Sequence, residues 1–239
     1  MHILAFESSA KAASVAVLAD GALLADYTQN SGQTHSRTLM EMAKDMLVNC
    51  ALAPQDISAV AVAVGPGSFT GVRIGMAAAK GFAWGLQLPL YGVSTLEAMA
   101  RGAAYADGAY CACMDARKGQ IYNAVFRYAG GALTRLTDDR AIAIEALAQE
   151  LADVQGPVYL VGDGAKLVSD TLAGRQLPLV LLPEQLRQQR AAGVALCAQA
   201  AIDAGLPGDA ASLSPNYLRQ AQAERTRAQD KDFYLKNHN

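Results

Sequence analysis

The chain has 239 residues, a length that fits one large domain or two small lobes. Hydrophobic residues make up 52% of the sequence but aromatic residues only 6%, so we expect a core of small aliphatic side chains. The formal net charge of -2 argues against the broad basic face of a nucleic-acid-binding protein. The N-terminus lacks a basic region, and no apolar run reaches about 18 residues without a charge. A soluble cytoplasmic protein without a membrane segment is expected.

The first segment is predicted to form a three-stranded meander followed by a helix. Strand-forming residues dominate positions 3–6, 14–18 and 23–28. Asp20-Gly21 is typical of the tight turn between the second and third strands. Beyond a polar loop, apolar residues recur at helical spacing from about Ser36 to Cys50, which predicts an amphipathic helix.

A glycine-rich loop follows the next predicted strand. The alternating apolar residues 57–64 lead into Gly-Pro-Gly-Ser-Phe-Thr-Gly-Val-Arg-Ile-Gly at residues 65–75. A strand, a glycine loop and a helix can present backbone N–H groups to an anion, and Ser68 or Thr70 can cap the helix. The loop matches neither the P-loop nor the dinucleotide fingerprint. Spacing alone therefore leaves both a structural turn and an anion contact open.

The helix expected from about Gly71 to Leu86 is unusually rich in small residues. They are Gly71, Gly75, Ala78, Ala79, Gly81 and Gly85. Each glycine in an exposed helix costs about 1 kcal/mol relative to alanine, so several together indicate close approach of another backbone. Close packing inside the same domain and docking of a partner both fit this pattern.

The second half of the chain repeats the opening pattern. Predicted strands at 109–114 and 121–128 flank the turn Asp115–Gln120, and a third strand begins at Ala132. Because Glu7 and Asp115 occupy matching positions in two similar meanders, we expect a duplicated lobe. The predicted organisation is an N-terminal lobe over residues 1–105, a C-terminal lobe over 106–212, and a return segment with a mobile tail over 213–239.

Further elements are expected in the C-terminal half. Gly162-Asp163-Gly164 joins a strand to a helix, which makes it a second strand–glycine–helix junction. The other predicted elements are helices at 143–151, 168–172 and 191–204 and an edge strand at 177–182. The four cysteines lack metal-ligand spacing and are expected to be reduced core thiols.

Three motifs together resemble one family. They are the glycine loop at 65–75, Met-Asp-Ala-Arg-Lys-Gly-Gln-Ile-Tyr at 114–122, and Pro-Asn-Tyr-Leu-Arg at 215–219. Meander lobes with acids at strand ends resemble the actin, Hsp70 and sugar-kinase (ASKHA) superfamily, an α/β class with two duplicated mixed-sheet lobes. The three motifs are similar to those of the TsaB family, formerly YeaZ, over most of the chain.

The resemblance implies a non-catalytic subunit. TsaB proteins are similar to TsaD, which transfers a threonylcarbamoyl group to the anticodon-adjacent adenosine of tRNAs reading codons that begin with A. TsaD-type enzymes hold a metal with an H-x-x-x-H motif, whereas this chain has only the dispersed His2, His35 and His238. Leucine stands where a second histidine would follow His35. No catalytic residue and no metal site are therefore expected.

Nucleotide binding is a separate question in this superfamily. Glu7 stands where the family usually carries aspartate, and serines 8 and 9 replace the Gly-Thr pair of active kinases, so the first phosphate loop is degraded. The candidate nucleotide contacts are Glu7, Ser8, Gly67, Ser68, Asp115, Gly162 and Gly164. As strand-end turns these residues need no ligand, and no cofactor is expected unless ATP or ADP is shared at a partner interface.

The resemblance also implies a docking surface on two helices of the N-terminal lobe. The residues assigned to it are Ser36, Arg37, Met40, Met42, Lys44, Gly71, Val72, Gly75, Ala78 and Ala79. Met42 falls off the main apolar stripe, so we expect it to face a partner. The expected partners are TsaD in a heterodimer, TsaE, and a second copy of the chain when TsaD is absent, with tRNA contacted only indirectly.

The resemblance to the TsaB family thus implies an accessory subunit that stabilises TsaD and helps to recruit TsaE. The rival hypotheses are a stand-alone ATP-dependent phosphotransferase on the same fold and a peptidase. The phosphotransferase would need an intact first loop, and the peptidase would need a nucleophile or a metal whose spacing the sequence does not contain.

Overall fold

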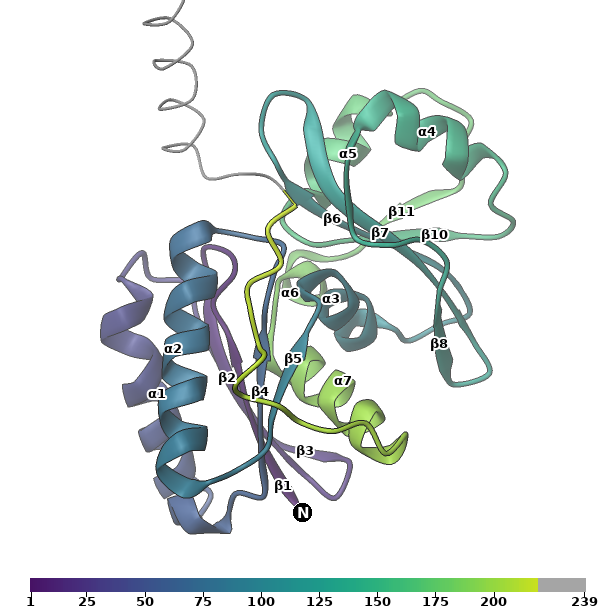
Figure 1. Cartoon of the computed structure of the whole chain (residues 1–239). Helices are drawn as coiled ribbons and strands as arrows, with labels where there is room; N and C mark the ends of the chain where they lie inside the picture. The colour runs from purple at the N-terminus through teal and green to yellow at the C-terminus, as the bar shows by residue number, and fades with distance from the viewer. Residues whose placement is uncertain (219–239) are drawn as a thin grey trace, which may run out of the picture.

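The computed structural model describes residues 1–218, and the expected mobile tail lies outside this range from residue 219 onward. Two β-sheets form the centres of two lobes, and helices cover both sheets (Figure 1). No helix within the described residues is long and apolar enough to cross a membrane. The described cysteines are all free, and Cys111, Cys113 and Cys197 are buried.

The first sheet combines an antiparallel meander with a parallel extension. Its strands are β1 (His2–Glu7), β2 (Ala13–Ala19), β3 (Ala22–Gln29), β4 (Ala59–Ala63) and β5 (Leu90–Val93), in the order β3-β2-β1-β4-β5. β1 pairs antiparallel with β2 and parallel with β4. The strand ends of β1 and β4 therefore lie side by side, and they position the first hairpin turn next to the glycine loop.

Helices pack on both faces of the first sheet. One face carries α1 (His35–Asn49) and α2 (Phe69–Leu86), while a 3-10 turn, η1 (Pro54–Asp56), connects α1 to β4. The opposite face carries α7 (Ala191–Asp203), which also packs on α3 (Thr95–Ala103). Alternating strand residues feed the two cores: Leu4 and Phe6 face α1 and α2, whereas Ile3 and Ala5 face α7.

The second sheet repeats the same plan. Its strands are β6 (Gly108–Asp115), β7 (Gln120–Ala129), β8 (Ala132–Arg135), β9 (Arg140–Ala143), β10 (Val158–Val161) and β11 (Leu179–Leu181). The order is β11-β10-β6-β7-β8, and β9 also pairs with β7. The β6-β7-β8 meander and the parallel β6–β10 pair correspond to β1-β2-β3 and β1–β4, so the predicted duplication is confirmed.

The helices of the second lobe differ between its two faces. α4 (Ile144–Ala152) and α5 (Ala165–Thr171) cover the face directed away from the first lobe (Figure 1). α3 and the short α6 (Glu184–Arg187) lie on the other face, between the lobes. The lobe boundary is thus built from helices rather than from a solvent-filled linker.

The end of the described chain returns to the first lobe earlier than residue 213. Ala191, Ala195 and Ala198 are fully buried against the first sheet, so α7 belongs to the first lobe although the sequence places residues 106–212 in the second. Helical periodicity identifies a buried face but not the sheet that covers it, which explains this difference. Residues 205–218 then run along β5 toward the top of α2 (Figure 1).

Candidate functional site

The glycine loop packs directly against the turn of the first hairpin. The backbone N–H of Ser68 donates to the carbonyl of Ser9 at 2.7 Å, and a Cβ at Gly67 would lie 2.6 Å from the same oxygen. Ser68 also caps α2, since its Oγ accepts the N–H of Gly71 at 3.2 Å. The loop is therefore engaged in packing and capping, and the predicted cap by Ser68 is confirmed.

The small residues at the start of α2 point at the same turn. A Cβ at Gly71 would overlap the Ser8 carbonyl oxygen, and one at Gly75 would overlap the Ser8 hydroxyl. That hydroxyl donates to the carbonyl of Gly71 at 2.9 Å. Glycine is thus required here for close approach between α2 and the first hairpin, which is the within-domain alternative left open by the sequence.

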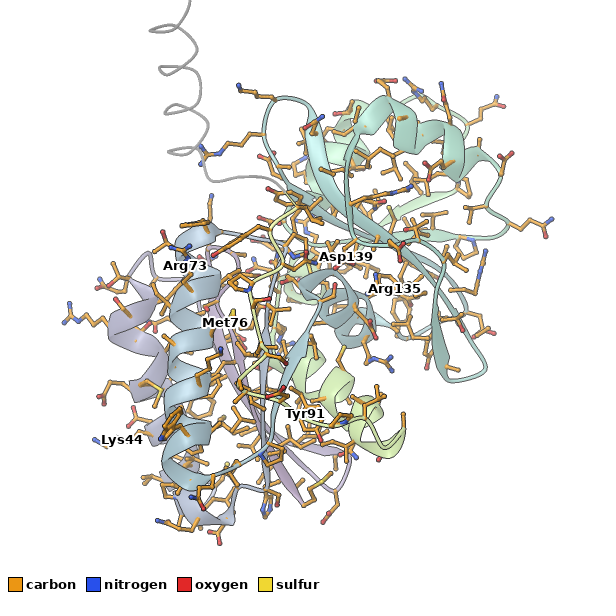
Figure 2. All side chains as sticks on the ribbon, viewed as in Figure 1. Lys44, Arg73, Met76, Tyr91, Arg135 and Asp139 are labelled. Carbon is orange, nitrogen blue, oxygen red and sulfur yellow. The ribbon has the colours of Figure 1, made fainter. Side chains whose placement is uncertain are left out.

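This packing corrects part of the predicted docking surface. Gly71, Val72, Gly75 and Ala79 are buried inside the folded chain, so as folded they offer no surface to a partner. Met42 and Ala78 are half-buried and pack against the core of the first lobe, which also corrects the expected outward position of Met42. The remaining predicted residues are exposed: Ser36, Arg37, Met40 and Lys44. Figure 2 shows Lys44 on the side of α1 away from the sheet.

The outer faces of α1 and α2 carry exposed apolar side chains, of which the sequence analysis had assigned Met40 to the docking surface but had missed Val48 and Trp84. Trp84 is 85% exposed, Val48 is 70% exposed and Met40 is 42% exposed. Ala77 and Gly81 lie on the exposed side of α2 with Trp84. Ala77, Gly81 and Trp84 are spaced by four and three residues, and residues at these intervals lie above one another on a helix. This spacing was the sequence signal for one face of α2. We call Met40, Val48, Ala77, Gly81 and Trp84 the outer face.

The carboxyl group of Glu7 is buried where the first strand ends. Its Oε1 accepts the N–H of Ser9 at 2.6 Å, while its Oε2 and the Ser9 hydroxyl have no hydrogen-bond partner among residues 1–218. Burial raises the pKa of Glu7 to about 7, and the negative charge of Asp163 adds to the rise. Hydrogen bonds from the backbone N–H groups of Ser9 and Ser8 oppose this shift.

The first hairpin is a poor fit for a phosphate group. The N–H of Ser9 is already bonded to Glu7, and the N–H of Ser68 is bonded to Ser9. Phosphate cradles depend on several free backbone N–H groups that converge on one point. In this conformation the N–H groups of Ser9 and Ser68 are therefore not free to bind a phosphate.

The predicted contacts of the second lobe have structural roles as well. Gly162 has a φ of +97°, and a Cβ there would overlap the carbonyl of Cys113. The N–H of Gly164 donates to the same carbonyl at 3.0 Å, so the β10–α5 junction packs tightly on β6. Desolvation raises the pKa of Asp163, and the charge of Asp115 adds to that rise. Asp163 therefore interacts electrostatically with Glu7 across the lobe boundary and with Asp115 within its own lobe.

A second polar cluster at the lobe boundary was not identified from the sequence. Asp139 accepts hydrogen bonds from Ser94 at 2.6 Å, from Arg135 at 2.7 Å and from the Asn216 amide at 3.4 Å. Arg135 also pairs with Glu97 of α3 at 2.9 Å. Figure 2 places Arg135 and Asp139 between the two lobes. The cluster joins α3, the segment after β8, and the return segment.

The return segment contacts the glycine loop as well as the second lobe. The N–H of Asn216 donates to the carbonyl of Val64 at 2.7 Å. Tyr217 stacks on Phe69 with ring centroids 4.8 Å apart, and the Arg73 guanidinium donates to the Tyr217 hydroxyl at 2.7 Å. The Pro-Asn-Tyr motif therefore fixes the top of α2 against the lobe boundary, and the nonlocal nature of these contacts explains why spacing did not predict them.

The described histidines serve local structure. Nε2 of His35 lies 2.8 Å from the carbonyl oxygen of Ala10, and Nδ1 of His2 lies 3.0 Å from that of Asp56. Each ring is thus positioned by a backbone group, and the two lie at separate places in the first lobe. His238 lies outside the described residues.

Two duplicated mixed sheets, each with an acid at the end of its first strand, define a two-lobed protein of the ASKHA class. A family model for TsaD, tRNA N6-adenosine threonylcarbamoyltransferase, matches residues 23–226. The tRNA threonylcarbamoyladenosine biosynthesis protein TsaB of Bacillus subtilis is 32% identical over 94% of this chain and 96% of its own length. The chain belongs to the TsaB family, as its motifs indicated.

Further comparisons agree with this assignment. The protein of the same name from Escherichia coli is 35% identical over 76% of this chain and 78% of its own length. YeaZ from Pseudomonas aeruginosa is similar in structure, with a TM-score of 0.78 and 26% identity, covering 91% of this chain and 99% of that one. The similarity in both sequence and structure therefore spans both lobes.

Proposed function

We propose that this chain is a non-catalytic accessory subunit in tRNA threonylcarbamoyladenosine biosynthesis. The names of the curated relatives support the pathway. In this proposal the chain binds and stabilises a TsaD-type transferase, and the pair contacts tRNA through the transferase. The occupied N–H groups of the first hairpin support a role without phosphate transfer by this chain alone.

The observation that carries the proposal is the apolar outer face of α1 and α2. Tryptophan is enriched among the residues that dominate binding energy at interfaces. Trp84 projects from a helix whose opposite side is fixed by Gly71 and Gly75 against the first hairpin. Rigid presentation lowers the entropy lost on binding, so the outer face suits a helical partner surface.

The outer face also suits two further assemblies, a homodimer of this chain and a complex that includes TsaE. In the absence of the transferase, two copies of the chain would pair through it as a homodimer, since an apolar face can be self-complementary. With the transferase bound, we propose that the pair forms the docking site for TsaE, and that ATP or ADP, if used, is held between subunits. Arg73 and Tyr217 lie at the top of α2, where a third subunit could reach both lobes.

Reconstitution with purified subunits tests the proposed role. Full modification of tRNA should require this chain, and addition of the chain alone to tRNA and ATP should give neither product nor ATP turnover. Full modification without the chain would reject the accessory role. ATP turnover by the chain alone, lost in Glu7→Ala, would favour the phosphotransferase, and peptide cleavage would favour the peptidase.

A further inference from the structure

The second hairpin turn lines a cavity that the proposed subunit role does not use. The cavity has a volume of about 500 Å³ and lies where the turn meets the first residues of α4 and the exposed side of α5. This volume lies within the range of small-molecule sites. Because α4 and α5 cover the face of the second sheet away from the first lobe, the cavity is separate from the first hairpin and the outer face (Figure 1).

Two cations at the edge of this cavity have no internal partner. Arg117 and Lys118 line it, and neither side chain forms an ion pair with a described residue. Their φ angles are +64° and +56°, in the left-handed region that side chains with a Cβ rarely adopt. Asparagine or glycine would suit these positions better, so local backbone structure does not explain the presence of arginine and lysine.

The acids around the cavity are already engaged. Asp115 accepts the N–H of Arg117 at 2.7 Å, and Glu145 forms an ion pair with Arg175. With Arg175 included, the charged side chains around the cavity carry one positive charge in excess. The two free cations are therefore available to an external anion, and a planar guanidinium beside an ammonium group suits phosphate oxygens.

The uncharged lining consists of Thr171, Gly119 and three apolar residues, Ala143, Ile144 and Leu167. Leu167, which is 38% exposed, contributes accessible aliphatic surface, whereas Ile144 is buried beneath it in the core of the second lobe. We propose that this cavity binds a small organic phosphate, whose phosphate oxygens contact Arg117 and Lys118 and whose apolar body rests on Leu167 and Ala143. An inorganic phosphate ion would contact only the two cations, so the cationic and the apolar contacts can be tested separately.

Calorimetric titration of the full chain tests this assignment, with ADP as the probe and with inorganic phosphate and adenosine as its two parts. The double variant Arg117→Asn/Lys118→Gly removes both cations and introduces residues that favour the left-handed turn, so the fold is retained. We expect its Kd for ADP to rise at least about tenfold, as expected for lost hydrogen bonds to charged groups. Arg37→Gln/Lys44→Gln, which removes the same charge from α1, should leave the Kd unchanged.

Two further variants locate the ligand. Leu167→Ser should weaken ADP more than inorganic phosphate, and Glu7→Gln at the first hairpin should leave both unchanged. The proposal is overturned if the wild-type chain does not bind ADP at millimolar concentration, if adenosine binds as tightly as ADP, or if the double variant binds normally. Loss of binding in Glu7→Gln alone would also overturn the proposal. If Leu167→Ser weakens ADP and inorganic phosphate equally, the proposed apolar contact with the organic part of the ligand is wrong.

Discussion

The two hairpin turns of the duplicated lobes share a local structure but have opposite surroundings. In each, a carboxylate at the end of the first strand accepts the N–H two residues later, from Ser9 to Glu7 at 2.6 Å and from Arg117 to Asp115 at 2.7 Å. The first turn is buried beneath the glycines of α2. The second is open and carries two unpaired cations above a cavity.

The difference between the turns lies in what packs on them rather than in their backbone. Serines at positions 8 and 9 let α2 approach the first turn, and the helix then closes over it. In the second lobe, the corresponding strand–glycine–helix junction packs on β6 through Gly162 and Gly164 and leaves the turn exposed. The first turn therefore supports α2 structurally, whereas the second turn carries the unpaired side chains of Arg117 and Lys118.

The largest expected effect comes from filling the contact between α2 and the first turn. Gly71→Ala places a methyl group against the Ser8 carbonyl, which is backbone and can move only with the hairpin. We expect the free energy of unfolding to fall by about 3 kcal/mol or more in urea titrations. Gly81→Ala on the outer face is the matched control, and it should raise stability by up to about 1 kcal/mol because nothing lies near it. Equal effects would mean that Gly71 is not packed against the first turn.

A second prediction concerns pH. Because the pKa of Glu7 rises from 4.5 to about 7, the folded chain retains a proton that the unfolded chain releases between these values. The free energy of unfolding should therefore fall by about 3 kcal/mol as pH rises through this range, then level off. Glu7→Gln removes this contribution, so its stability relative to wild type should improve from pH 4.5 to pH 8.

Urea unfolding at the two pH values measures this change. Glu41→Gln, which removes an exposed carboxylate from α1, is the control for the loss of one acidic group. If the difference in the free energy of unfolding between Glu7→Gln and wild type is the same at both pH values, Glu7 does not titrate in a buried site. The description of the first turn as buried and the second as open would then be wrong.

The smallest effect is expected at the second turn. Asp115→Ala removes one hydrogen bond from an exposed backbone N–H, so the cost should stay below about 1 kcal/mol. The same denaturant titration measures it. A loss above about 2 kcal/mol would show that the second turn supports its lobe as strongly as the first supports α2.

Sequence patterns predicted the repeated architecture but not all of the contacts between its parts. The two meanders, the buried strand before the glycine loop and the Ser68 cap follow from local periodicity and turn chemistry. The direction of the small face of α2 was not predictable, since Gly71 contacts Ser8, 63 residues away. The Asp139 cluster and the docking of α7 on the first sheet also depend on long-range packing.

The central claim, that the chain acts by binding a TsaD-type transferase through the outer face, is tested most directly by measuring that affinity. The transferase should come from the same organism, and titration calorimetry should compare wild type with Trp84→Ala and Met40→Asp. Both changes should weaken binding at least about tenfold. Tyr105→Ala, which removes an exposed aromatic ring outside this face, should leave it unchanged. Unchanged affinity in both outer-face variants, or no complex with wild type, would contradict the account.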